Sequence, residues 1–114
     1  MQEHIPKAIE TEVRRLVGLL VAADYRGMFQ MCPKSRARQE DLVHAVQEYG
    51  RTFVMPSGAL QLDVISVSRA VVPQWSVVAP LWTVEDGLSD LSLELTARKV
   101  GARVELAIDD LRAR

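Results

Sequence analysis

Few side chains in this sequence could form a catalytic or metal-binding site. Its two histidines, His4 and His44, lie far apart, and neither is part of an HxH or HExxH arrangement. The single cysteine, Cys32, stands in the apolar stretch MFQMCP, where a buried thiol has a raised pKa and reacts poorly. Because no close set of His and Cys ligands exists, we expect neither a metal nor a cofactor.

Three acidic residues lie close together between two apolar runs, at Glu85, Asp86 and Asp90. They lack the alternating oxygen ligands and the closing Glu of a calcium loop, so calcium binding is not predicted. The pair Asp86-Gly87 is instead typical of a tight turn. Two hypotheses remain for these acids, a solvated hairpin turn or the charged rim of an interface.

Two tryptophans are the strongest candidates for contact with a partner. Trp75 and Trp82 fall in opposite phases of one predicted strand, so only one of them can face the main core unless a bulge intervenes. The other could pack under a helix or the chain end, line a pocket, or serve as an exposed aromatic anchor. As an anchor, Trp82 would be flanked by the three acids of the turn.

Size, charge and cysteine content limit the classes of function. With 114 residues, the chain has the size of one domain, expected over residues 1–114. The formal net charge of -1 lacks the basic excess of nucleic-acid-binding proteins. A single cysteine favours a reducing compartment, and neither a secretory signal nor a long apolar run is present. We therefore expect a cytoplasmic protein that binds neither nucleic acid nor membrane.

One basic cluster occurs, at Lys34, Arg36 and Arg38. We interpret it as the solvated entrance of a helix, against the alternative of a phosphate clamp.

The first half of the chain predicts helices. Residues 6–23 carry one apolar stripe at helical spacing, and Pro6 suits the first turn. Gly27 is expected to take a left-handed cap conformation, and a second helix over residues 35–49 is expected to begin at Ser35 and to end at Gly50. The stripe of the first helix comprises Ile9, Val13, Leu16, Val17 and Leu20.

The second half predicts four strands, at residues 59–68, 74–83, 89–99 and 102–108. A phase switch predicts a bulge near Val64-Ile65, and Pro80 favours an edge or a bulge. Pairing Leu95 with Leu106 would keep the apolar residues of the last two strands on one side.

Together these elements predict an α+β domain, with N-terminal helices packed on a curved, antiparallel, four-stranded sheet. Its core is expected to join Leu91, Leu93 and Leu95 of the sheet to Val13 and Leu20 of the first helix.

Residues 80–95, followed by Ile108-Asp109-Asp110-Leu111, carry a recognisable pattern. It resembles the signature of a bacterial family of small uncharacterised domains, in which Leu-Trp-Thr, an acidic pair with Gly, and Ser-Asp-Leu precede an alternating strand. The order of elements also looks like the cone fold of nuclear transport factor 2 and ketosteroid isomerase. Families of this size often act as immunity proteins beside secreted bacterial toxins, so the resemblance implies, by analogy, a protein that blocks a toxin.

The leading hypothesis is a non-enzymatic, immunity-type binding domain that contacts a partner protein. An acidic surface would suit a basic partner, because opposite potentials speed encounter. The residues expected to make this contact are Trp82, Glu85, Asp86 and Asp90.

Two alternatives remain open. One is a small-molecule-binding or isomerase-like and cyclase-like domain, with a pocket between helix and sheet. The other is a homodimer formed through the outer face of the sheet. The pocket of the first alternative would be lined by Tyr25, Phe29, Tyr49 and Trp75.

Overall fold

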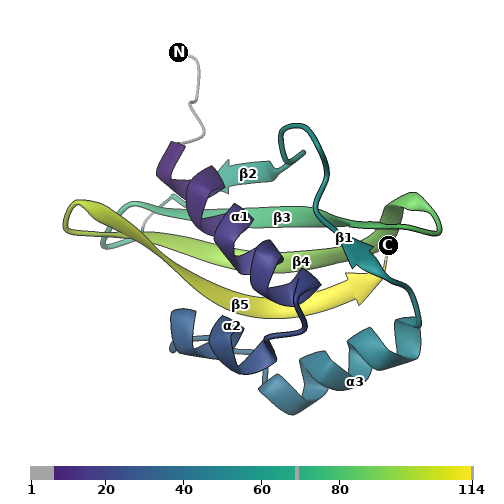
Figure 1. Cartoon of the computed structure of the whole chain (residues 1–114). Helices are drawn as coiled ribbons and strands as arrows, with labels where there is room; N and C mark the ends of the chain where they lie inside the picture. The colour runs from purple at the N-terminus through teal and green to yellow at the C-terminus, as the bar shows by residue number, and fades with distance from the viewer. Residues whose placement is uncertain (1–6, 69, 114) are drawn as a thin grey trace.

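The computed structural model describes residues 7–68 and 70–113, in which three helices precede five strands (Figure 1). The predicted helix start at Pro6 and the residue His4 lie outside this range. The helices are α1 (Lys7–Val21), α2 (Tyr25–Met31) and α3 (Gln39–Tyr49). The strands are β1 (Phe53–Val54), β2 (Asp63–Ser66), β3 (Gln74–Thr83), β4 (Gly87–Val100) and β5 (Arg103–Ala113).

Helix α1 lies across one face of the sheet, and all five residues of its predicted stripe are buried (Figure 1). Leu91, Leu93 and Leu95 of β4 share one core with Val13 and Leu20 of α1, as predicted. The α+β class is therefore confirmed. No helix in the described part of the chain is long and apolar enough to cross a membrane.

The break after α1 differs from the prediction. Ala23, with a φ of 59°, takes the left-handed conformation, whereas Gly27 lies within α2. Asp24 caps that helix, since its Oδ1 accepts the Gly27 N–H at 2.9 Å. A Cβ at position 27 would collide with the Asp24 carboxylate, so glycine is needed here for space and not for its φ.

The start of α3 also differs, because Ser35 does not cap it. Helix α3 begins four residues later, after Arg38, which makes no side-chain cap. The Ser35 hydroxyl instead donates to the Cys32 carbonyl at 2.7 Å and accepts the Ile108 N–H at 2.8 Å. The predicted end is confirmed, since Gly50 adopts the left-handed conformation with a φ of 65°.

The sheet is antiparallel throughout its described strands, in the order β1-β3-β4-β5, with β2 paired to β3 beside β1. The expected number of four strands was wrong, because the two-residue β1 also pairs with the end of β3. The first predicted strand shortens to β2, whereas the last one extends through Ala113.

The predicted bulge in β2 was wrong, since Val64 and Ile65 pair with β3 without interruption. One register shift lies between Pro80 and Trp82, where two steps along β3 match four steps along β4. Pro80 therefore stands beside an irregularity, as its missing N–H favours. A second shift lies beside Glu94, where β5 carries one extra residue.

The predicted pairing of the last two strands was wrong by two residues. Leu95 pairs with Ile108, and Arg98 faces Glu105. The connection is the two-residue turn Gly101-Ala102, where Gly101 has a φ of 62°. A slip of two residues keeps every side chain on its predicted face, because side chains alternate with a period of two.

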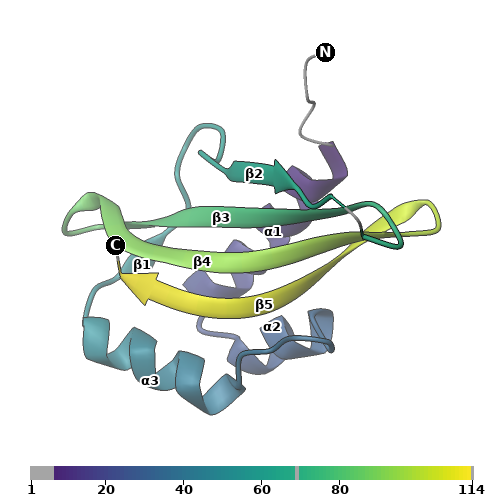
Figure 2. The same cartoon turned by 180° about the vertical axis from the view of Figure 1, so that it is seen from behind.

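Seen from behind, β3 and β4 expose a face that no helix of the described chain crosses (Figure 2). We call it the outer face. Cross-strand neighbours share a face of a sheet. Val78, Glu94 and Asp110, as well as Gln74, Arg98 and Glu105, therefore form rows across this outer face.

Candidate functional site

The site is built on the turn between β3 and β4. Thr83 pairs with Gly87 at the last rung of the hairpin, and Val84, Glu85 and Asp86 form the connection. Gly87 has a φ of 70°, a conformation that suits glycine, and the Asp86 N–H donates to the Thr83 hydroxyl at 3.0 Å. We call this turn, together with Trp82, Leu88, Ser89 and Asp90, the hairpin end.

Glu85 ties the hairpin end to the segment before β1. Its Oε1 accepts the Thr52 N–H at 2.9 Å, and its Oε2 accepts the Thr52 hydroxyl at 3.0 Å. The Val84 N–H also donates to the Thr52 carbonyl, at 2.9 Å. The bond from the Thr52 backbone is the largest cause of a lowered pKa for the Glu85 carboxyl, because it stabilises the charged form. Glu85 therefore fixes the position of the turn against Thr52.

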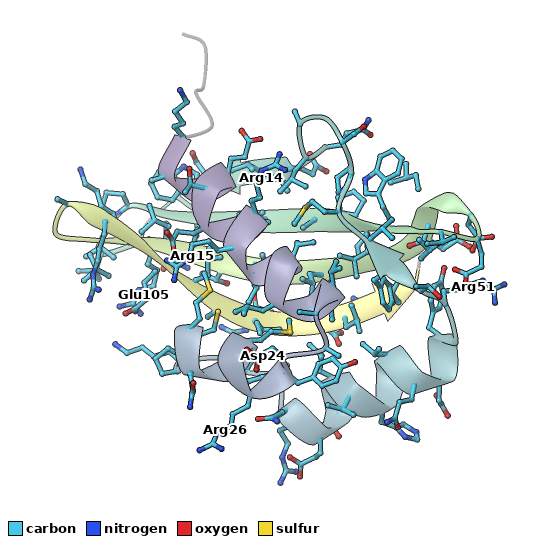
Figure 3. All side chains as sticks on the ribbon, in the orientation of Figure 1. Arg14, Arg15, Asp24, Arg26, Arg51 and Glu105 are labelled. Carbon is cyan, nitrogen blue, oxygen red and sulfur yellow. The ribbon has the colours of Figure 1, made fainter. Side chains whose placement is uncertain are left out.

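Asp86 makes a second link, to Arg51, whose Nε lies 3.1 Å from the Asp86 Oδ2. Arg51 lies beside this end of the sheet (Figure 3). The hydrogen bond that Arg51 donates to Asp86 raises the pKa of the Arg51 guanidinium above its ordinary value. Such an exposed ion pair contributes little stability, so its main effect is on the orientation of the two side chains.

Asp90 occupies the irregularity between β3 and β4. The Ser89 hydroxyl donates to the Leu81 carbonyl at 2.9 Å and accepts the Leu91 N–H at 3.1 Å. These hydrogen bonds fix the irregular segment of β4 against the end of β3, and Asp90 within it is exposed. A cleft of about 420 Å³ adjoins it, lined by Tyr49, Arg51, Asp86, Leu88, Ser89 and Asp90.

The two tryptophans lie on opposite faces of β3. Trp75 packs against the core from the α1 side. Trp82 is half-buried on the outer face, in a row between Val54 of β1 and Leu88 of β4. Its indole Nε1 is buried without a hydrogen-bond partner in the described part of the protein. Of the two tryptophans, Trp75 packs against the core and Trp82 does not.

Two apolar residues complete the hairpin end, and the sequence analysis did not single them out. Val84 is 66% exposed and Leu88 is 47% exposed. Leu88 shares a cross-strand row with Trp82, which places an aromatic and an aliphatic side chain together. Leu88 directly follows the Asp86-Gly87 turn and lies outside the alternation of Leu91, Leu93 and Leu95. This position in the sequence could have indicated that Leu88 is exposed.

The four residues of the predicted pocket come from three elements. Tyr25 and Phe29 lie on α2, Tyr49 ends α3, and Trp75 lies near the start of β3. All four are partly buried and packed against the core. Tyr49 stacks on Phe53 with ring centroids 6.1 Å apart, and it also lines the cleft of the hairpin end.

The described residues include no group of three His, Cys, Asp or Glu side chains that could hold a metal ion. His44 is exposed on α3, with its Nε2 at 3.2 Å from Glu48. Cys32 is buried, and burial, with smaller contributions from Glu12 and Glu105, raises the pKa of its thiol to about 12. A thiol of this kind is a poor nucleophile.

A family model matches residues 17–113, which is most of the chain, and its description is a domain of unknown function, DUF7668. The matched region contains every residue of the hairpin end. No curated protein and no solved structure matches the chain.

Proposed function

The chain belongs to the DUF7668 family, whose description carries no function, and we propose from its own geometry that it is a non-enzymatic binding domain. In this proposal the hairpin end contacts a basic surface of a partner protein. The observation that carries the proposal is that Val84, Leu88 and Asp90 are exposed on a turn that Thr52 and Arg51 hold in place.

Interfaces combine an apolar centre with a polar rim, and tryptophan is among the residues that contribute most to binding energy. Leu88 and Trp82 would supply the apolar centre, and Asp90 would supply the charge. The hydrogen bonds from Arg51 and Thr52 hold the turn in one conformation. They favour binding, because a preorganised turn loses less conformational entropy when a partner docks.

This proposal changes the roles expected for two acids. Glu85 has both oxygens bonded to Thr52, and Asp86 is paired with Arg51. These two residues would position the turn, whereas Asp90 would meet the partner. Opposite potentials would then speed the encounter with a basic site.

The finer proposal is a bacterial immunity-type protein whose partner is a secreted toxin. It is supported by the resemblance of residues 80–95 to the hairpin signature of a bacterial family of small domains, since this segment contains most of the hairpin end. The order of three helices before a curved antiparallel sheet supports the topological likeness to the cone fold of nuclear transport factor 2. That likeness concerns fold alone and transfers no catalytic residues.

The experiment is calorimetric titration with the protein encoded by the neighbouring gene. Leu88→Asp and Asp90→Lys should each weaken binding by about tenfold or more, which corresponds to about 1.4 kcal/mol. Ile65→Asp and Asp63→Lys are matched controls, because both residues are exposed on β2, away from the hairpin end, and these variants should bind as the wild type does. Equal affinities for all four variants and the wild type, or no binding by the wild type, would overturn the proposal.

A further inference from the structure

Two arginines on the outer face of the sheet have very different surroundings. Arg112 forms ion pairs with Glu94 at 3.8 Å and with Asp110 at 3.7 Å. Arg98 forms no ion pair with any residue that the structure describes, although Glu105 lies directly opposite on β5. The Arg98 Nε is buried and has no hydrogen-bond partner among the residues that the structure describes. A buried guanidinium nitrogen without an acceptor is costly, so this atom needs an explanation.

Arg98 lies in a cleft between the outer face and the loop that connects α2 to α3. Figure 2 shows this loop passing below β5. The Arg36 and Ala37 N–H groups donate to the Ile108 carbonyl at 2.9 and 3.0 Å, and the Ser35 hydroxyl accepts the Ile108 N–H. Three hydrogen bonds therefore hold the backbone of the loop on the edge of β5, beside the cleft.

Asp109 also lines the cleft, and its carboxylate has two partners within the protein. Asp109 is the extra residue of β5 at the register shift beside Glu94. A bulge of this kind changes the direction of the side chain that it carries. Its Oδ2 accepts the Thr96 hydroxyl at 2.7 Å, and its Oδ1 lies 3.9 Å from the Arg36 Nε. The contacts of Asp109 are therefore with Thr96 and Arg36 and not with Arg98.

We propose that this cleft binds a small anion through a carboxylate or phosphate group, with Arg98 as the principal contact. Three cations line it against two acids, Glu105 and Asp109, which leaves one formal positive charge in excess. A guanidinium presents a planar fork of donors that matches the oxygens of a carboxylate or phosphate. The cations that line the cleft are Lys34, Arg36 and Arg98.

The size of the cleft restricts the ligand. Its volume is about 180 Å³. Pockets for drug-sized ligands begin at roughly 300 Å³, so the cleft matches the size of a small organic acid or an inorganic anion. The basic cluster at Lys34 and Arg36, interpreted above as a solvated helix entrance, becomes one wall of this site. The cleft lies at the opposite end of β4 from the hairpin end, so the inference is independent of the proposed function.

The test is a titration followed by amide NMR shifts, with inorganic phosphate in one series and succinate in another, both at constant ionic strength adjusted with chloride. The wild type should show saturable shifts at Thr96, Arg98 and Ala107 in at least one series. Saturation by phosphate alone would assign a phosphoryl ligand, and saturation by succinate alone would assign a carboxylate. Saturation by neither anion would overturn the proposal.

Variants then test the role of Arg98. Arg98→Gln should weaken binding by about tenfold or more, because a hydrogen bond to a charged group is lost. Arg112→Gln is the matched control on the same face and should leave binding unchanged. Arg98→Lys keeps the charge without the fork and provides a second variant if Arg98→Gln fails to fold; it should also bind more weakly than the wild type. Wild-type affinity in a folded Arg98→Gln or in Arg98→Lys would overturn the assignment.

Discussion

At the scale of single residues, Cys32 shows how the fold controls chemistry. The thiol is 1% exposed, in the same core as Met28 and Ile108. Burial disfavours the thiolate and raises the pKa from 9.0 to about 12, and the charges of Glu12 and Glu105 act in the same direction. The sequence analysis predicted this behaviour from the apolar neighbours alone, and it is confirmed.

This pKa predicts a pH dependence of stability. Between pH 9.0 and about 12 the unfolded chain loses the thiol proton and the folded chain keeps it, so the thiol lowers the free energy of unfolding as pH rises. Below pH 9.0 its contribution is fully present. The slope should approach 1.4 kcal/mol per pH unit, which is about the free energy of one pKa unit.

The measurement is urea unfolding of the wild type and Cys32→Ala at steps from about pH 8 to about pH 11. The other titrating groups are common to both proteins, so the difference in slope isolates the thiol. The variant will be less stable throughout, yet its stability should fall less steeply with pH. Parallel curves would contradict the prediction.

At the scale of elements, the connection between α2 and α3 depends on Ser35. Its hydroxyl joins the end of α2 to the middle of β5, since it bonds both the Cys32 carbonyl and the Ile108 N–H. The sequence predicts that Ser35 caps the second helix, and this prediction is wrong. Which backbone group a hydroxyl reaches depends on the strand that packs beside it, and local sequence does not contain that information.

Ser35→Ala should lower the free energy of unfolding by about 1 to 3 kcal/mol, because the Ile108 N–H loses its acceptor in a half-buried place. Ser57→Ala, at an exposed serine in the connection before β2, should change it by less than about 0.5 kcal/mol. Urea unfolding measures both changes. If the two variants are equally stable, the Ser35 hydroxyl does not secure the loop.

At the scale of the whole molecule, the sheet has two unequal faces. Helix α1 covers one face and forms the core with it, whereas the outer face stays free of helices in the described chain (Figures 1 and 2). Leu93 on the covered face is fully buried, but Leu88 of the same strand is 47% exposed. Identical side chains on β4 should therefore differ in their contribution to stability.

Leu93→Ala should cost about 2 to 5 kcal/mol, because it leaves a cavity beneath α1. Leu88→Ala should cost less than about 0.5 kcal/mol, because its side chain is near solvent. Thermal or urea unfolding of both variants gives the comparison. A large loss of stability for Leu88→Ala would mean that this leucine belongs to the core, and the proposed interface would lose its apolar centre.

Local patterns in the sequence are enough to predict the covered face of the sheet and the helix that packs on it. The spacing of Ile9, Val13 and Leu20, and the alternation of Leu91, Leu93 and Leu95, are local patterns, and periodicity assigns such residues to one side of a helix or strand. It also located the acidic turn between β3 and β4. These features need no knowledge of distant contacts.

Three features become visible only in the folded protein: the exact strand register, the hydrogen bonds from Thr52 to Glu85, and the common cleft of Lys34, Arg36 and Arg98. The last two join residues far apart in the chain. A register slip of two residues keeps the same hydrophobic pattern, so periodicity cannot detect it. Side-chain partners across such separations are set by how the elements pack, and both candidate sites depend on such partners.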